Sequence, residues 1–333
     1  MFILRYILLT LGGVTFFILG LKFMSENMEK LAGEKMQKVL STFTKNKYAG
    51  VLTGAVSTAI MQSSVATNVI LVGFTASGIL SFYSASAVIM GANIGTTMTA
   101  QLVSLSGNSS FDITALGSLI AFVGLIFMFF KNEKVNLIGG VFAGFGMLFF
   151  GLNVISDSVA YFKNFEAFRK LFLVKNHFLL VLNGIVITAI IQSSSAVTSI
   201  MIVLASNGLI NFESAMFLIL GTNVGTCICV LVAASGKPVE ARRSAFFNIF
   251  FNIIGAVLYF VPLSLFSSEV ASAFANFSGG IERQIANFHT LFNVAVTIIL
   301  LPTLKPVTNL CSLIINDKKS INRVGYRLKL NKT

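Results

Sequence analysis

Charged residues are scarce in this chain of 333 residues: Asp, Glu, Lys and Arg make up 11% of it, whereas an ordinary soluble domain carries about 25%. Hydrophobic residues make up 55%. So little charge excludes an ordinary soluble domain and indicates an integral membrane protein. The predicted fold class is all-α and polytopic, with helices of about 20 residues crossing the bilayer.

Cysteine is also rare. The three cysteines, Cys227, Cys229 and Cys311, form an odd set, and two of them lie within a predicted span. Neither a disulfide framework nor a metal site is supported by such a set. We expect all three to be small apolar fillers, and no cofactor is expected.

Apolar segments of membrane length follow one another along the chain. Seven are predicted to cross the membrane, at 3–24, 85–105, 112–130, 137–155, 213–233, 244–266 and 286–304. The first is too long for a signal peptide and is expected to stay as the first helix. Two further apolar stretches, about 48–80 and 178–210, contain polar motifs and are predicted to be re-entrant helical hairpins.

These polar motifs occur twice. Gln62-Ser63-Ser64 precedes Gly91-Ala92-Asn93-Ile94-Gly95-Thr96, and 130 positions later Gln192-Ser193-Ser194-Ser195 precedes Gly221-Thr222-Asn223-Val224-Gly225-Thr226. From Gln62 to Thr96 the two copies match at 14 of 35 positions. Polar, helix-breaking interruptions at equivalent places in two halves are the best sequence pointer to the binding site of a secondary transporter.

The basic residues indicate topology rather than a nucleic-acid partner. With the N-terminus outside and the hairpins re-entrant, 18 of the 24 Lys and Arg residues fall on the cytoplasmic side, as the positive-inside rule requires. Each copy then has three crossings, which inverts the second copy and lets the hairpin tips meet near the midplane. The predicted units are a first repeat at 1–130, a second at 131–270, a final helix at 271–304 and a basic cytoplasmic tail at 305–333.

An amphipathic segment follows the first span. Apolar residues recur at three- and four-residue spacing from Met28 to Phe43, among lysines and glutamates. This pattern is typical of a helix in the membrane interface, and binding of a calmodulin-like partner is the alternative. The stretch after Ser156, as far as Phe172, is expected to be its counterpart on the opposite side.

The duplicated core is nearly uncharged and rich in hydroxyl and amide groups. A Ser-Ser pair at the start of a helix presents hydroxyls and free N–H groups, which suit an oxyanion. The Gly-x-Asn-x-Gly-Thr segments are predicted to be unwound, with oxygens that suit a small alkali cation. Since the core offers no Lys or Arg and almost no proton relay, sodium coupling is favoured over proton coupling. Close helix packing through small residues is the alternative explanation.

These residues resemble the type II sodium–phosphate cotransporter family, whose hallmark is a duplicated Gln-Ser-Ser-Ser hairpin followed by Gly-Ala-Asn-Ile-Gly-Thr. The resemblance covers about residues 11–304 and includes Ala241-Arg242-Arg243-Ser244-Ala245 and Phe288-His289-Thr290-Leu291-Phe292-Asn293. It implies sodium-driven uptake of inorganic phosphate by alternating access, in the inner (plasma) membrane of a cell. Many bacterial relatives append a PhoU-like domain, and this chain is predicted to be a bacterial member without one.

The resemblance also implies the site. The expected phosphate-binding residues are Gln62, Ser63, Ser64, Gln192, Ser193, Ser194 and Ser195. The expected sodium-binding residues are Thr58, Asn93, Thr96, Thr188, Asn223 and Thr226. Two departures matter: Val65 replaces the third serine of the first triplet, and no acid lies between Ala115 and Leu125, where electrogenic animal members carry an aspartate. Electroneutral transport, with two sodium ions for each divalent phosphate, is therefore expected.

Other functions remain open from the residues. Hydroxyls and dipoles recognise charge and shape, so a sulfate or arsenate carrier is one alternative, and a non-transporting membrane scaffold is another. An intramembrane enzyme would need a nucleophile–base pair or metal ligands, and no acid or His lies near either serine cluster in sequence. A homodimer in membrane lipid is one arrangement that the residues allow. His177 is expected at the interface, and His289 is expected to bond a neighbouring helix.

Overall fold

The computed structural model describes residues 2–42, 46–105, 113–162 and 176–316. The described residues form twelve helices, so the all-α prediction is confirmed. The helices are α1 (Phe2–Thr42), α2 (Lys47–Met61), α3 (Ser64–Ala76), α4 (Phe82–Ser104), α5 (Ile113–Met128), α6 (Glu133–Phe162), α8 (His177–Ile191), α9 (Ser194–Ser206), α10 (Phe212–Ala233), α11 (Val239–Ser278), α12 (Ile281–Leu300) and α13 (Leu304–Ile314).

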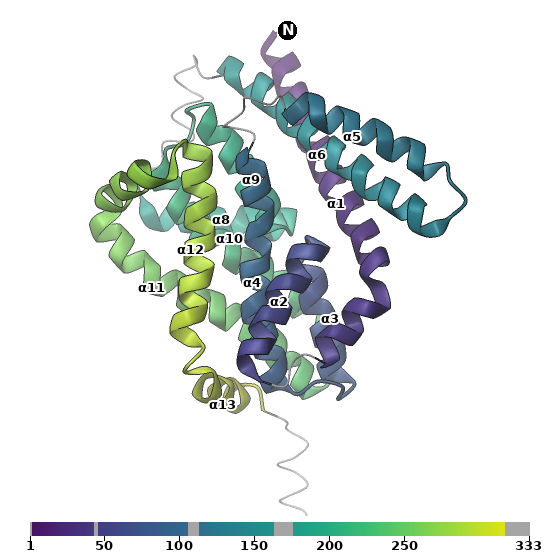
Figure 1. The fold of residues 1–333 in the computed structure, drawn as a ribbon. Helices are drawn as coiled ribbons and strands as arrows, with labels where there is room; N and C mark the ends of the chain where they lie inside the picture. The colour runs from purple at the N-terminus through teal and green to yellow at the C-terminus, as the bar shows by residue number, and fades with distance from the viewer. Residues whose placement is uncertain (1, 43–45, 106–112, 163–175, 317–333) are drawn as a thin grey trace, which may run out of the picture.

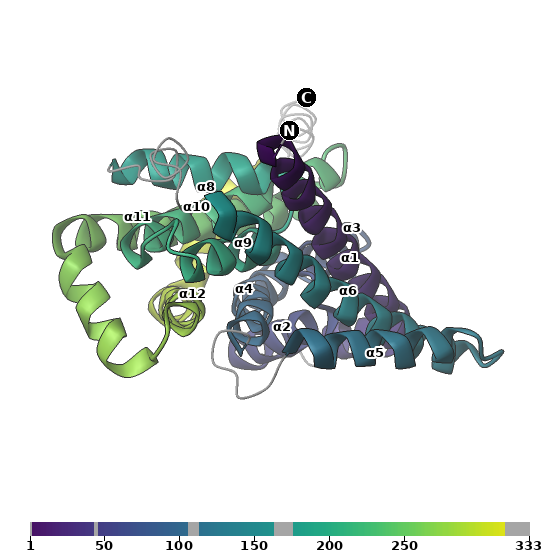
Figure 2. The ribbon, with the colours of Figure 1, turned by 90° about the horizontal axis from the view of Figure 1, so that it is seen from above.

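Helices α1, α5 and α6 form one side of the molecule, and the remaining helices gather on the other (Figure 1). The view from above agrees: α5 and α6 extend side by side away from the rest, with α1 crossing beside them (Figure 2). Helices α2 and α3 lie in the lower half of Figure 1, whereas α8 and α9 lie in the upper half.

Four of the described helices are long and apolar enough to cross a membrane, namely Ile3–Gly33 of α1, α6, α10 and α11. A fifth span arises if α12 and α13, which meet at a bend of 85°, count as one. The seven predicted crossings are thus met in part. Two predicted crossings are not among these spans. α5 has only 16 described residues, and α4 is continuous but contains Ser, Asn, Thr and Gln side chains that lower its mean hydropathy.

The first helix continues beyond its predicted span. α1 runs to Thr42 but has non-helical dihedrals at Gly33 (φ 25°, ψ −120°). Beyond this break, Met36 and Leu40 are buried, so the predicted amphipathic helix exists as the last part of α1. Most of its predicted counterpart, residues 163–172, lies outside the described residues.

The Gly-x-Asn-x-Gly-Thr segments are helical, which corrects the prediction that they unwind. α4 and α10 run through Gly91–Thr96 and Gly221–Thr226 without a break. The glycines serve close packing instead: a Cβ on Gly91 would overlap the carbonyl oxygen of Val51 in α2, and one on Gly221 would overlap that of Val181 in α8. The glycines therefore bring each of these helices into backbone contact with the first helix of its hairpin.

Glycines also join α1 to α6. A Cβ on Gly13 would lie 3.0 Å from the carbonyl oxygen of Gly151, and one on Gly20 would lie 2.8 Å from that of Gly144. The residue numbers rise along one helix as they fall along the other, so the two helices pack antiparallel.

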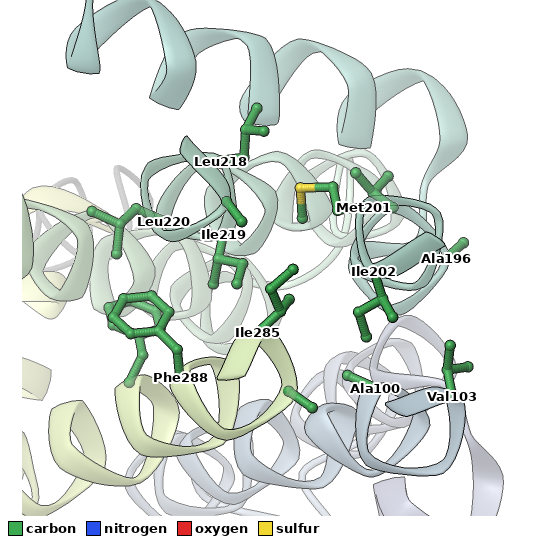
Figure 3. Packing of buried hydrophobic residues seen from close by; sticks show 14 of the residues in the cluster. Ala100, Val103, Ala196, Met201, Ile202, Leu218, Ile219, Leu220, Ile285 and Phe288 are labelled. Atoms are coloured by element: carbon green, nitrogen blue, oxygen red, sulfur yellow. The ribbon is translucent and has the colours of Figure 1, made fainter. Parts of the chain in front are cut away.

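The buried core lies where the two sequence copies meet. Figure 3 shows Ala100 and Val103 of α4 beside Ala196 and Ile202 of α9. Residues of α10 and α12 complete the cluster in the same view: Leu218, Ile219, Leu220, Ile285 and Phe288. This core fixes the second hairpin against α4 of the first copy.

Candidate binding site between the two hairpin tips

Each Gln-Ser motif breaks a helix at the same point. Gln62 and Gln192 are the only non-glycine residues of the described chain with positive φ, at 53° and 62°. Each ends a helix in the left-handed conformation and donates its backbone N–H to the carbonyl of the threonine four residues earlier, Thr58 or Thr188. The Gln62 side chain is held by Ala59 O (Nε2, 2.6 Å) and by the hydroxyl of Thr99 (Oε1, 2.8 Å).

The following serine starts the next helix. Ser63 and Ser193 are extended N-cap residues whose hydroxyls accept hydrogen bonds from Ala66 N (3.1 Å) and Ala196 N (3.2 Å). A serine cap is a strong helix start, so the short sequence Gln-Ser ends one helix and begins another. The predicted helical hairpins, with their motifs at the tips, are therefore confirmed as helix–turn–helix units.

Both tips line one pocket of about 280 Å³. Gln62 and Ser63 come from the first tip, and Ser193 and Ser195 come from the second. The Ser193 and Ser195 hydroxyls lie 3.1 Å apart. Helices α3 and α9 begin directly after Ser63 and Ser193. The N-terminus of each helix therefore contributes partial positive charge to the pocket.

The predicted phosphate residues are thus brought together in part. Gln62, Ser63, Ser193 and Ser195 line the pocket. The other three, Ser64, Gln192 and Ser194, lie at the same tips but outside the lining, and Ser194 is buried.

The predicted sodium residues lie in the helices behind the tips. Thr58 is buried and donates to Thr67 across the first hairpin (3.0 Å), whereas the buried Thr188 hydroxyl has no hydrogen-bond partner among the described residues. A Cβ on Gly95 would touch Thr58 at 2.7 Å, and one on Gly225 would touch Thr188 at 2.9 Å, so each threonine faces a Gly-Thr motif.

The amides and threonines of those motifs are held within the helix bundle. Asn93 donates to Ile89 O (2.9 Å), and Asn223 donates to Asn293 of α12 (2.9 Å). The hydroxyls of Thr96 and Thr226 each bond the carbonyl four residues earlier, at 3.0 Å.

The two histidines have structural neighbours. His289 is fully buried, and its Nε2 lies 3.4 Å from Asn223 Oδ1, so the expected bond to a neighbouring helix is confirmed. His177 stacks on Phe217 with ring centroids 4.1 Å apart at the start of α8.

The pocket also has charged residues that the sequence reasoning missed. Lys22, Glu26 and Glu29 of α1 line it. The duplicated core is nearly uncharged as predicted, but α1, which lies outside that core, brings charge to the pocket. A signal was present: Gly20-Leu21, Ser25 and Glu26 recur 131 positions later as Gly151-Leu152, Ser156 and Asp157. This weaker repeat pairs α1 with α6 in sequence.

Membrane-length helices around a polar pocket, built from duplicated helix breaks, define a solute carrier. The chain belongs to the Na+/Pi-cotransporter family, whose sequence model matches residues 16–157 and 164–279. The resemblance carried by the duplicated motifs is thereby confirmed. The protein is a multi-pass membrane protein of a transporter family and not an enzyme.

Several named proteins are similar to the chain. The uncharacterized protein YqeW of Bacillus subtilis is 30% identical over 307 residues, which cover 92% of this chain and 97% of that protein. The putative inorganic phosphate export protein YjbB of Escherichia coli is 26% identical over 317 residues, and the chain spans 56% of its length. Mouse sodium-dependent phosphate transport protein 2B is 36% identical over 125 residues, 36% of this chain and 18% of that protein. No solved structure matches.

Proposed function

We propose that this protein couples sodium movement to the transport of inorganic phosphate by alternating access, with phosphate bound between the two hairpin tips. The observation that carries the proposal is the shared pocket: two serine-capped helix starts, 130 residues apart in sequence, face one cavity. Helix N-termini and hydroxyls are the groups that bind phosphate without a covalent step.

In the proposed mechanism the two copies have opposite orientations, and the contact between α1 and α6 supports that arrangement. Gly13 lies against Gly151, and Gly20 lies against Gly144. With the offset of 131 positions, Gly13 is the counterpart of Gly144 and Gly20 is the counterpart of Gly151. Equivalent helices that cross antiparallel, through equivalent residues, are what an inverted repeat produces.

The coupling ion is proposed to bind the buried oxygens behind the tips. Within the part of the chain that the structure describes, the buried hydroxyls of Thr188 and Thr198 have no hydrogen-bond partner, and neither has Oδ1 of Asn68, the counterpart of Thr198. Such oxygens are costly unless something bonds them, and hard oxygen ligands suit an alkali cation. Thr58, Asn93, Thr96, Asn223 and Thr226 complete the proposed sodium-binding set.

The direction of net transport is part of the proposal. Uptake driven by inward sodium is the first candidate, by likeness to the sodium-dependent mouse relative. Export is the second candidate, since the Escherichia coli relative is named a putative phosphate export protein.

The test is phosphate flux in proteoliposomes with sodium on one side only. Phosphate flux that follows the sodium gradient, whichever way the gradient points, supports the coupled carrier. The direction of net phosphate movement is then measured in cells depleted of phosphate. Flux of sulfate or arsenate at equal rates would identify a broader oxyanion carrier. No flux of any oxyanion would contradict the proposal and favour a scaffold.

A further inference from the structure

One wall of the pocket between the tips is charged, and α1 forms it. Lys22, Ser25, Glu26 and Glu29 line the pocket together with Ser63 and Ser193. Among the described residues of the lining, Lys22 is the single Lys or Arg. It brings a full positive charge to a pocket whose other attraction for anions comes from helix starts and hydroxyls.

The ion pair that holds Lys22 is loose. Its Nζ lies 3.8 Å from Oε1 of Glu26, and the two side chains are 68% and 51% exposed. The lysine precedes the glutamate by four residues, which is the less favourable order on a helix. Exposed pairs of this kind contribute little to stability, so the ammonium group can change partners at small cost.

The charge of a divalent phosphate exceeds what the tips supply. Each helix start contributes roughly half a positive charge, so α3 and α9 together offset about one of the two negative charges. The Ser193 and Ser195 hydroxyls can turn from each other toward the anion. The ammonium group of Lys22 lines the same pocket and adds a fixed positive charge there, beside the charge that the proposed sodium ions bring.

We propose that Lys22 binds the transported anion and that Glu26 is the counter-ion that Lys22 leaves when the anion arrives. The inference rests on the proposed function and identifies a further anion-binding residue of that site. The equivalent residues of the second copy are Asn153 and Asp157. An acidic residue is therefore present in both copies, whereas the lysine is present in the first copy alone. The proposed contact between a lysine and the anion is thus made by α1 and has no counterpart in α6.

The experiment measures phosphate uptake by proteoliposomes that contain Lys22→Gln, Lys22→Arg, Glu26→Gln or the double variant Lys22→Gln with Glu26→Gln. Lys22→Gln should raise the KM for phosphate about ten- to a hundredfold, because a charged hydrogen bond to the ligand is lost. Lys22→Arg should stay near wild type. Glu26→Gln should lower KM about two- to fivefold, because the competing carboxylate is gone, and should have no effect once Lys22 is Gln.

The matched control is Lys30→Gln, which removes the same charge from α1 at a residue that lines a neighbouring pocket instead of the tips. Its KM should equal that of wild type. An unchanged KM in Lys22→Gln overturns the inference, and so does a Glu26→Gln effect that persists without Lys22. A higher half-saturating sodium concentration in Glu26→Gln would identify Glu26 as a sodium ligand and overturn its counter-ion role. Wild-type protein without phosphate flux in either direction would overturn the proposed function as well. Loss of flux in Ser193→Ala with a normal KM in Lys22→Gln would overturn the role of Lys22 and leave that function standing.

Discussion

The side-chain hydroxyl of Ser25 donates a hydrogen bond to the backbone carbonyl oxygen of Met61 at 2.9 Å. This bond ties α1 to the last turn of α2, directly before Gln62. The second copy differs: Ser156, the counterpart of Ser25, accepts a bond from Asn207 Nδ2 at 3.0 Å, at the far end of α9. Related copies with unequal contacts are expected of a carrier that alternates between two conformations, as proposed above.

The first prediction uses this inequality. Asn207→Ala removes a bond that the second copy makes in this conformation, so the population should shift toward the other conformation, in which the α1 side of the pocket closes. A single cysteine at Ile18, which lines the pocket, should then react more slowly with an impermeant reagent. Ser206→Ala, which loses only a local bond to Val203 O, serves as control. Equal labelling rates in both variants would contradict the shift.

The second prediction concerns the hydroxyls at the tips. Ser193→Ala and Ser195→Ala should each weaken phosphate affinity about ten- to a hundredfold, since a hydrogen bond to a charged ligand contributes roughly 1.5–3 kcal/mol. Uptake kinetics in proteoliposomes measure this. Ser272→Ala provides the matched control, because its hydroxyl bonds Ser268 O on the exposed part of α11. Wild-type kinetics in both tip variants would show that phosphate does not bind in this pocket.

The third prediction tests the opposite orientation of the hairpins. Asn46 and Asn176 are exposed equivalents that cap α2 and α8 through bonds to Ala49 N and Leu179 N. Single cysteines at these two positions, in a background without the three native cysteines, should be labelled from opposite faces of the membrane. Each substitution loses one cap of about 1 kcal/mol, so the two variants are matched in stability. Labelling from a common face would rule out inverted repeats.

The fourth prediction concerns the glycine contact between α2 and α4. Gly91→Ala should lower the thermal midpoint of the detergent-solubilised protein, because the added methyl group overlaps Val51 O, and overpacking costs about 1–3 kcal/mol. Gly73→Ala in α3 should not lower it, since a Cβ there meets nothing within 4 Å. Equal midpoints for the two variants would show that the contact relaxes without cost.

The fifth prediction is electroneutral transport, with two sodium ions for each divalent phosphate. Net charge moved across the membrane would couple transport to the potential at about 2.3 kcal/mol per elementary charge and 100 mV. Uptake rates should therefore be the same with and without an imposed potential. A phosphate-induced current in sodium, or uptake driven by protons in the absence of sodium, would refute this stoichiometry.

The sequence was sufficient to predict the hairpins. Gln62-Ser63 and Gln192-Ser193 are local signals, because a serine favours the first position of a helix, and both serines cap a helix in the structure. Their duplication predicts a binding site. Whether Gly91–Thr96 is helical or unwound was not predictable from the segment alone. Glycine suits both an unwound turn and a close helix contact, and only the position of Val51 O in α2 decides between them.

The charged wall of the pocket could not be read from the duplicated motifs. Lys22 and Glu26 lie about 40 residues before the first tip and about 170 before the second, and a membrane-spanning pattern alone does not give the face on which they lie. The faint repeat of Gly20-Leu21 and Ser25 in α6 pairs α1 with α6 in sequence. It does not predict that α1 lies beside both tips, because that contact forms only in the folded chain.

The glycine contacts hold the first helix of each hairpin more closely than the second. α2 lies against α4, and α8 against α10, with direct backbone approach at Gly91 and Gly221. The second helices pack on both copies: α3 contacts α11 as well as α4, and α9 contacts α4 as well as α10. If the two copies rotate against each other, as in the proposed alternating access, each hairpin would turn at Gln62 or Gln192, beside the proposed anion site. An anion that bridges the two tips would stiffen both turns at once, so the occupancy of the proposed site would set how easily the carrier reorients.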